Sequence, residues 1–228
     1  PDSVVAKPTA PRRTPFELPQ TLAPQLASLV DRIPPGDDWL YEIKFDGYRL
    51  LTRVDGHSVR CFTRNGNDWS AKLPTLIDAV RACKLAPCWL DGEVVVLDAS
   101  GVPDFQALQN AFDDKRTSAL TYFVFDLPFY DGNDLRGQPL TTRRERLQAL
   151  LATNSQPLIR FSDAFAGDPA ALLASAGKAG LEGLIGKRKD SLYRSARSTD
   201  WVKLKTAQRQ EFVIGGYTDP KGARTGIG

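Results

Sequence analysis

The residue types that this chain has least of already exclude several classes of mechanism. Among 228 residues there is one histidine, His57, and there are three cysteines, Cys61, Cys83 and Cys88. A mechanism that needs a pair of histidines, or a zinc site with several histidine ligands, is therefore excluded. The cysteines are too few and too irregularly spaced for a disulfide framework or a zinc site, and they fit a protein of the reducing cytosol.

Long apolar runs and methionine are also missing. No stretch approaches the about 20 apolar residues that a membrane helix needs, and the Pro-rich, polar N-terminus has no apolar segment of the kind found in signal peptides. We therefore expect no membrane association. Methionine is absent even from position 1, which predicts that the sequence is a fragment or a processed piece of a longer chain.

Two common phosphate-binding patterns are absent as well. No Gly-x-Gly-x-x-Gly follows a predicted strand, and there is no Walker-type Gly-Lys-Ser/Thr loop. Both patterns bind phosphate through backbone N–H groups at the start of a helix. A nucleotide, if one is bound, must therefore be held by side chains on strands.

The net charge of +3 does not by itself indicate a nucleic-acid partner. The basic residues are unevenly spread, however, and they crowd into the C-terminal third, where clusters such as 187–189 could follow phosphates. For Arg143, Arg144 and Arg146 the favoured interpretation is a solvated helix face.

The order of predicted elements indicates an α+β fold with antiparallel sheets. Residues 1–20 read as a linker or extended arm, and residues 21–33 show a short amphipathic helical pattern that ends at Pro34. Strands are expected at 39–45, 48–54, 58–64, 88–97, 121–129, 183–188, 200–205 and 211–217, and helices at 73–83, 104–112, 141–152 and 169–180. Asp46-Gly47 and Asp55-Gly56 predict tight hairpin turns.

A second domain is expected to begin near residue 207 and to be cut off at residue 228.

The most informative local pattern is Lys-x-Asp-Gly-x-Arg, formed by Lys44, Asp46, Gly47 and Arg49 within an otherwise apolar stretch. An apolar setting favours the neutral amine of a lysine, which can attack an electrophile. Asp46 and Arg49 are close enough in sequence to tune that amine and to hold an anionic substrate. The competing interpretation is a charged hairpin tip.

Further segments add groups that suit a nucleotide. Arg64 ends a predicted strand, while Glu93 and Glu182 each stand beside a glycine at the start of an apolar strand, where a carboxylate is costly to bury without a partner. Phe125 lies in an aromatic strand and could stack on a base. Lys203 and Lys205 alternate with apolar residues and so point to one face, where two ammonium groups repel unless an anion lies between them. Taken singly, each of these also fits a turn, an edge position or the core.

In this order, the segments resemble the successive motifs of the covalent nucleotidyltransferase superfamily, which contains ATP-dependent DNA ligases, RNA ligases and mRNA capping enzymes. The segments 39–51, 63–69 and 216–222 look closest to the ligase module of bacterial ligase D, which joins double-strand breaks together with the Ku protein. The similarity covers about residues 20 to 228. It implies an α+β, ATP-grasp-like nucleotidyltransferase domain over residues 21–206, followed by the start of an OB-fold domain at 207–228.

The resemblance also implies roles for individual residues. Lys44 would be the nucleophile that forms lysyl-Nζ–AMP. The nucleotide would be held by Glu42 on the adenine amino group, Ile43, Phe125 stacked on the ring, Arg49 and Arg64 on ribose and phosphate, and Glu93 on the ribose or a metal. Glu182, with Asp46 nearby, would bind Mg²⁺ or Mn²⁺. Lys203 and Lys205 would neutralise the α-phosphate as pyrophosphate leaves.

The expected reaction is ATP-dependent DNA ligation through a lysyl-adenylate. Expected partners are DNA ends or nicks, Ku and other catalytic domains of the parent chain, and the resemblance implies a monomer in the bacterial cytoplasm, near the nucleoid. Only the first part of the family's OB-fold domain is present, which puts complete self-adenylation by this piece in question. The alternatives are an RNA ligase or capping guanylyltransferase of the same superfamily, and a non-catalytic module that binds nucleic-acid ends.

Overall fold

Two β-sheets dominate the structure, a computed structural model that describes residues 17–114 and 116–206. The first, called sheet A here, has the order β1–β11–β10–β2–β9, and the second, sheet B, has the order β4–β3–β5–β6–β7, with β8 added beside β6. Sheet A consists of β1 (Leu26–Leu29), β2 (Trp39–Ile43), β9 (Ala164–Phe165), β10 (Gly183–Arg188) and β11 (Arg197–Lys205). Sheet B consists of β3 (Tyr48–Asp55), β4 (Ser58–Thr63), β5 (Cys88–Val96), β6 (Leu120–Tyr130), β7 (Asn133–Asp134) and β8 (Ile159–Phe161). This architecture agrees with the predicted α+β class.

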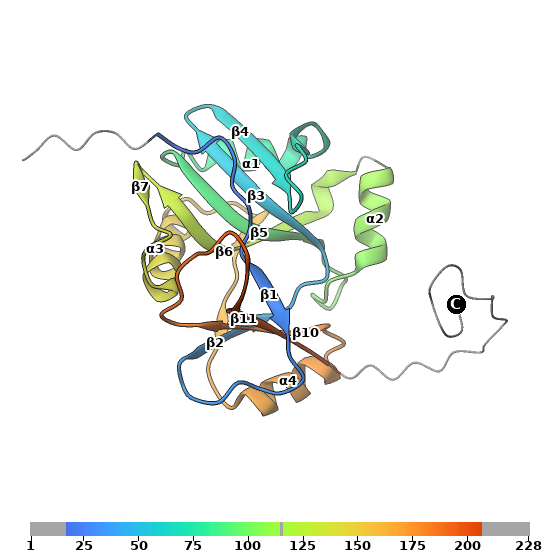
Figure 1. The fold of residues 1–228 in the computed structure, drawn as a ribbon. Helices are drawn as coiled ribbons and strands as arrows, with labels where there is room; N and C mark the ends of the chain where they lie inside the picture. The colour runs from blue at the N-terminus through green and yellow to red at the C-terminus, as the bar shows by residue number, and fades with distance from the viewer. Residues whose placement is uncertain (1–16, 115, 207–228) are drawn as a thin grey trace, which may run out of the picture.

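The helices divide unequally between the sheets (Figure 1). Contacts join α1 (Pro74–Ala82) to β4, α2 (Phe105–Asp113) to β5 and α3 (Leu140–Thr153) to β6, all in sheet B, whereas α4 (Pro169–Lys178) contacts β10 of sheet A. Two 3₁₀ turns, η1 (Ser70–Lys72) and η2 (Thr117–Ala119), flank α1 and β6. Asp168 caps α4 through a hydrogen bond from the Ala171 N–H, as the Asp-Pro pair predicts. Within the described residues no helix is long and apolar enough to cross a membrane.

The predicted helix at 21–33 is wrong. Part of this segment is β1, which runs parallel to β11, and the Leu26 N–H donates to the Ala196 carbonyl at 3.0 Å. Leu22 instead packs against a buried cluster in sheet B that consists of Leu51, Phe62, Trp89 and Phe129. The leucines that matched a helical period are thus shared between two sheets, and Pro24 interrupts a helix between them.

The two predicted hairpins have different outcomes. The turn at Asp55-Gly56 is confirmed, because β3 and β4 pair up to Asp55 and Ser58, and Gly56 has a φ of 60°. A hairpin at Asp46-Gly47 is wrong, because β2 lies in sheet A and β3 in sheet B, so this segment crosses between the sheets. A Cβ on Gly47 would lie 2.3 Å from the Val94 carbonyl oxygen, so glycine allows the crossing chain to approach β5 closely.

The remaining strands and α-helices were predicted to within a few residues, apart from the short strands β7, β8 and β9, which were missed together with the 3₁₀ turns η1 and η2. The predicted strand at 211–217, the expected OB-fold segment and most of the N-terminal arm lie outside the described residues. At the end of that arm, the Pro19 carbonyl accepts hydrogen bonds from Trp89 Nε1 and Arg53 Nε, both at 3.0 Å. Residues 17–22 therefore lie against sheet B before the chain enters sheet A.

Candidate active site

A cavity of about 450 Å³ receives side chains from both sheets. It is lined by the predicted residues Glu42, Ile43, Lys44, Arg49, Arg64, Glu93, Phe125 and Lys203, together with others that include Ile185, Lys187, Arg197 and Trp201. Eight side chains that are scattered over 160 residues of sequence are thus brought to one place. Asp46, Glu182 and Lys205 are not part of the lining. Glu182 pairs with both Lys44 and Lys205, and Asp46 interacts with Lys44 through its charge.

Lys44 follows β2 directly and is fixed at the crossing between the sheets. Its N–H donates to the Gly183 carbonyl at 3.0 Å, which extends the pairing of β2 with β10 by one residue. Its ammonium group pairs with the Glu182 carboxylate, and the other Glu182 oxygen lies 3.3 Å from Lys205 Nζ. One carboxylate therefore bridges two ammonium groups at the edge of the cavity.

Lys203 adds a third positive charge on this side of the cavity. Burial, followed by the neighbouring charges of Lys44 and Lys205, lowers the pKa of Lys203. The cations repel one another while no anion lies between them. A polyphosphate in the cavity would relieve this repulsion.

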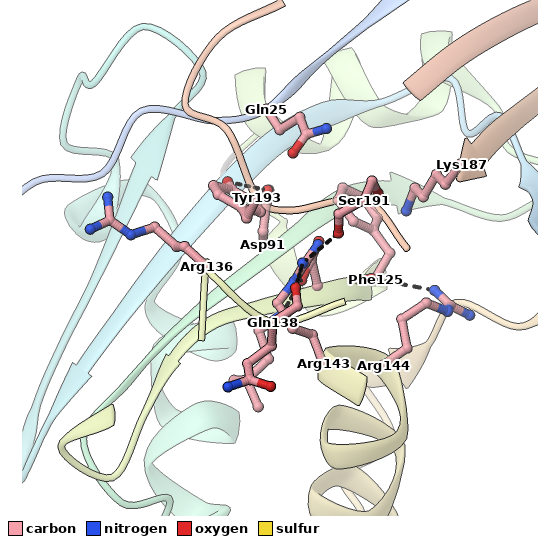
Figure 2. A network of polar contacts seen from close by, with 12 residues as sticks. Gln25, Asp91, Phe125, Arg136, Gln138, Arg143, Arg144, Lys187, Ser191 and Tyr193 are labelled. Carbon is pink, nitrogen blue, oxygen red and sulfur yellow. Dashed lines mark hydrogen bonds and ion pairs between the residues drawn. The ribbon is translucent and has the colours of Figure 1, made fainter. Parts of the chain in front are cut away.

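Arg49 comes from β3, and its guanidinium group is held in place by the buried carboxylate of Asp91. Its Nε and Nη2 donate to the two carboxylate oxygens of Asp91 at 2.6 and 2.8 Å, and the Tyr193 hydroxyl donates to the same carboxylate at 2.7 Å. Burial disfavours the charged guanidinium, but the Asp91 carboxylate outweighs this effect and raises the pKa of Arg49. Figure 2 shows Asp91 and Tyr193 joined within a larger polar network. The planar fork of Arg49 is therefore fixed, with its guanidinium carbon 4.5 Å from the centre of the Phe125 ring.

Phe125 lines the cavity and is also part of the hydrophobic core. Its side chain is only 6% exposed and packs in a small cluster with Leu140 and Trp201, yet the residue also lines the cavity. A place in the core therefore does not exclude a contact between Phe125 and a ligand in the cavity.

The interpretation of Arg143 and Arg144 as a solvated helix face is wrong. Arg143 is fully buried and binds both oxygens of Asp126, and Arg144 is buried against Glu42, whose Oε1 accepts from Arg144 Nη1 at 2.9 Å. Both arginines lie on the side of α3 that faces β6, as Figure 2 shows for their side chains. Each arginine thus pairs with a buried carboxylate, Arg143 with Asp126 and Arg144 with Glu42.

Lys187 was missed as a site residue. It is 2% exposed, and its Nζ lies 2.7 Å from Glu42 Oε1 and 4.2 Å from the centres of both the Phe125 and Trp201 rings. Burial lowers the pKa of Lys187 to about 8, against the opposing influence of Glu42. Its place in β10 was a usable signal, because a lysine inside a central apolar strand needs a buried partner.

Glu93 does not occupy a solvent-facing edge position, because β5 lies between β3 and β6 in the middle of sheet B. Burial raises the pKa of Glu93 to about 7, with Arg49 and Lys44 acting in the opposite direction. For Asp46, burial and the charge of Glu182 raise the pKa, while Lys44 and Lys205 lower it. Glu93 and Asp46 thus each feel the charge of Glu182.

The carboxylates fit a cation that is held only partly by protein. Within residues 17–114 and 116–206, no three His, Cys, Asp or Glu side chains gather closely enough to enclose a metal ion. Mg²⁺ is commonly bound by one or two carboxylates together with substrate phosphates, and hard oxygen ligands suit both Mg²⁺ and Mn²⁺. Glu182, with Asp46 or Glu93, can supply one or two such ligands and does not form a closed metal site.

Arg64 lies in the turn that follows β4 and is exposed at the cavity rim. The turn is closed by a hydrogen bond from the Thr63 N–H to the Asn67 carbonyl at 2.9 Å, and Gly66 has a φ of 80°. Arg64 is therefore free to reach a ligand that enters the cavity from solvent.

The comparisons with known proteins agree with this geometry. The family model "ATP dependent DNA ligase domain" matches residues 21–205. The multifunctional non-homologous end joining protein LigD of Pseudomonas aeruginosa is 56% identical over 211 residues, which is 92% of this chain but 25% of that protein. The chain thus spans about a quarter of the length of this relative.

Two solved structures match with 37% identity and a TM-score of 0.73: the ligase domain from M. tuberculosis LigD, and mycobacterial DNA ligase D complexed with ATP and MES. Each match covers 81% of this chain and 60% of the other chain. These matches confirm the predicted nucleotidyltransferase fold. The chain belongs to the family of ATP-dependent DNA ligase domains.

Proposed function

We propose that Lys44 attacks the α-phosphate of ATP and forms a lysyl-Nζ–AMP intermediate with release of pyrophosphate. The AMP then passes to the 5′-phosphate of a DNA end, and a neighbouring 3′-hydroxyl attacks that phosphate, seals the strand and releases AMP. The observation that supports this best is the position of Lys44: its amine lies at a cavity between the two sheets, paired with Glu182 and surrounded by further cations.

Each stage of the first step has a group in place. The amine must lose a proton before it attacks, and the Glu182 carboxylate beside it can accept that proton. Lys203 and Lys205 would stabilise the negative charge that develops as pyrophosphate leaves. Nucleotidyl transfer depends mostly on alignment and charge stabilisation, which fixed cations supply.

The part of the cavity that is lined by Phe125 and Arg49 of sheet B and by Glu42 of sheet A would hold the nucleoside. Phe125 offers an aromatic ring, Glu42 an acceptor for the adenine amino group, and Arg49 a fixed fork for ribose or phosphate. Arg64 at the rim would follow the phosphates. Glu182 with Asp46 and Glu93 would hold Mg²⁺ or Mn²⁺, which would neutralise phosphate charge and align the reacting groups.

The biological setting follows from the relatives. The similar LigD proteins are named multifunctional and assigned to non-homologous end joining. We infer that this chain acts in the same kind of break repair in the bacterial cytoplasm, near the nucleoid. Its partners would be DNA ends, Ku and further catalytic domains of its parent chain.

The test is the intact mass of the full-length protein that carries this chain, measured before and after incubation with ATP and Mn²⁺. We expect a gain of one AMP that pyrophosphate removes and that Lys44→Ala abolishes. Lys178→Ala, an exposed lysine at the end of α4, is the control and should keep the adduct. No adduct in the wild-type protein would overturn the proposal, and an adduct from GTP but not ATP would point to the capping-type alternative.

A further inference from the structure

Glu42 lies at the centre of a buried ionic network at the inner end of the cavity. Its Oε1 accepts from Arg144 Nη1 at 2.9 Å and lies 2.7 Å from Lys187 Nζ, and its Oε2 accepts from the Ser162 hydroxyl at 2.8 Å. Glu42 is only 2% exposed, yet it is one of the residues that line the cavity. The carboxylate is therefore held on both oxygens while one part of it still faces the ligand space.

Counting acceptor sites shows what remains available. A carboxylate offers about four lone-pair positions, two on each oxygen. Arg144 donates to Oε1, Lys187 Nζ pairs with the same oxygen by charge without a well-aligned hydrogen bond, and Ser162 occupies one position on Oε2. One acceptor position on Oε2 is left for a ligand, which matches a single N–H donor.

Arg144 is fixed independently of Glu42. Its Nη2 donates to the Ser162 carbonyl at 2.7 Å, and its Nη1 also reaches the Phe125 carbonyl at 3.3 Å. Its guanidinium carbon lies 4.6 Å from the centre of the Phe161 ring. Arg144 therefore joins α3 to the end of β8, to β6 and to β2, and sets the plane of the Glu42 carboxylate against all three.

Ser162 completes the arrangement from the opposite oxygen. It is 2% exposed, and its N–H donates to the Val124 carbonyl at 2.9 Å, so its backbone is tied to β6, the strand that carries Phe125. Glu42 is 102 residues from Arg144 and 120 from Ser162 in sequence, so neither partner can be read from the local pattern around Lys44.

We propose that Arg144, assisted by Ser162, is a positioning residue for base selection. It orients Glu42 so that the remaining acceptor position receives the exocyclic amino group of the adenine. The proposal rests on the proposed function, because it assumes that the nucleotide enters this cavity with its base toward Glu42. Arg144 acts through Glu42 and does not itself touch the ligand.

The predicted consequence is a change in discrimination between substrates. ATP has a 6-amino group, whereas purine riboside 5′-triphosphate lacks it and is otherwise the same. A hydrogen bond to a charged group is worth enough to favour ATP by roughly 10- to 100-fold in the wild-type protein. Replacing Arg144 frees the carboxylate to rotate toward Lys187, and the preference should fall to about 3-fold or less.

The experiment measures kcat/KM for adduct formation with each of the two triphosphates in the full-length protein. Arg144→Lys keeps a positive charge but loses the two guanidinium nitrogens that donate hydrogen bonds to the Ser162 and Phe125 carbonyls. Arg143→Lys is the matched control, because Arg143 is the neighbouring buried arginine on α3 but binds Asp126 instead of Glu42. Partial unfolding lowers both rates together and cancels in their ratio.

The proposal is supported if the ATP preference collapses in Arg144→Lys, falls partly in Ser162→Ala and persists in Arg143→Lys. An unchanged preference in both Arg144→Lys and Ser162→Ala overturns it, as does an equal loss in Arg143→Lys. If Arg144→Lys does not fold, Ser162→Ala, which removes a single hydroxyl, decides the question. A wild-type protein that forms no adduct with ATP at all refutes the proposed function itself, and this inference with it.

Discussion

The two sheets differ in how much core supports them and in what they contribute to the cavity. Within the described residues, the main cluster on sheet B contains 23 buried residues and three helices contact that sheet. Among the same described residues, the cluster beneath sheet A contains only Tyr41, Ala176, Leu184 and Leu204, and Ala176 comes from α4. The charged groups proposed to act at the reacting phosphate come from sheet A and its edges: Lys44, Glu182, Lys203 and Lys205. The groups proposed to orient the nucleoside come mostly from sheet B, which carries Arg49, Glu93 and Phe125, with Glu42 added from sheet A.

This difference suggests a division of work. A sheet that is backed by a large, close-packed core can hold a guanidinium group and an aromatic ring in fixed positions, as ligand binding requires. Sheet A, which has the smaller core, supplies ammonium groups whose placement depends more on charge than on packing. If this is correct, substitutions in the core of sheet B should change stability most, and substitutions on sheet A should change chemistry most.

The largest effect is expected from a core substitution in sheet B. Leu90→Ala, in a fully buried position of β5, should lower the free energy of unfolding by about 4–5 kcal/mol, the upper part of the range for buried leucines. Leu184→Ala, at 2% exposure in β10 of sheet A, should cost about 2–3 kcal/mol because fewer apolar neighbours surround the cavity it leaves. Denaturant unfolding of both variants measures the difference, and equal losses would contradict the contrast in support.

The next effect separates chemistry from stability on sheet A. Lys203→Met should slow adduct formation by about 10²-fold, since it removes a fixed charge near the leaving phosphate, and should leave the unfolding midpoint nearly unchanged. Lys205→Met, on a side chain that is 55% exposed, should slow the reaction by less than about tenfold. Single-turnover kinetics at saturating ATP measure both, and a larger effect at Lys205 would reverse this assignment.

A smaller effect is expected for nucleotide affinity on sheet B. Phe125→Leu keeps an apolar side chain in the core but removes the ring, and should weaken nucleotide binding by about tenfold, within the range for base stacking on an aromatic side chain. Phe129→Leu is the control on the same strand, because Phe129 packs in a different cluster with Trp89 and Leu51. Calorimetric titration of both variants with a non-hydrolysable ATP analogue makes the comparison, and equal affinities would assign Phe125 to the core alone.

The smallest effect concerns pH. The pKa of Glu93 is raised from 4.5 to about 7 in the folded protein, mainly by burial. The folded state therefore binds this proton more tightly than the unfolded state, and the stability that Glu93 contributes is full below pH 4.5 and is lost as the pH rises to about 7. Glu93→Gln cannot titrate, so its Tm should gain a few °C on the wild type between about pH 5 and pH 8.

Thermal unfolding of both proteins across this pH range, without nucleotide, measures the shift. Parallel pH profiles would show that Glu93 titrates normally.

Part of the site could be predicted from sequence because several of its residues stand at strand ends, in patterns set by local chemistry. Lys44, Arg64 and Glu182 all lie beside or within turns that the glycines mark, and the cap at Asp168 fixed the start of α4. What failed depended on partners far away in the chain. The strand β1 is defined by pairing with β11, about 170 residues later, and a helical spacing of leucines could not reveal it.

Charge burial was the other failure. Arg143 and Arg144 look like a surface pair because arginine is usually exposed, and only the position of α3 against β6 brings them to Asp126 and Glu42. Lys187 was overlooked for the same reason, since its buried partner Glu42 lies in another strand. The buried charged residues that support Glu42 and Asp126 are thus the part of the candidate site that a sequence pattern predicts least well.

The central claim, that the lysine at the crossing between the sheets is the nucleophile, is tested most directly by locating the adduct. Lys44, Lys187 and Lys203 all line the cavity, so a mass gain alone does not distinguish them. Peptide mapping of the full-length protein after incubation with ATP and Mn²⁺ should find AMP on the peptide that contains Lys44. An adduct on Lys187 or Lys203, with Lys44 unmodified, would contradict the assignment of the reactive chemistry to that crossing.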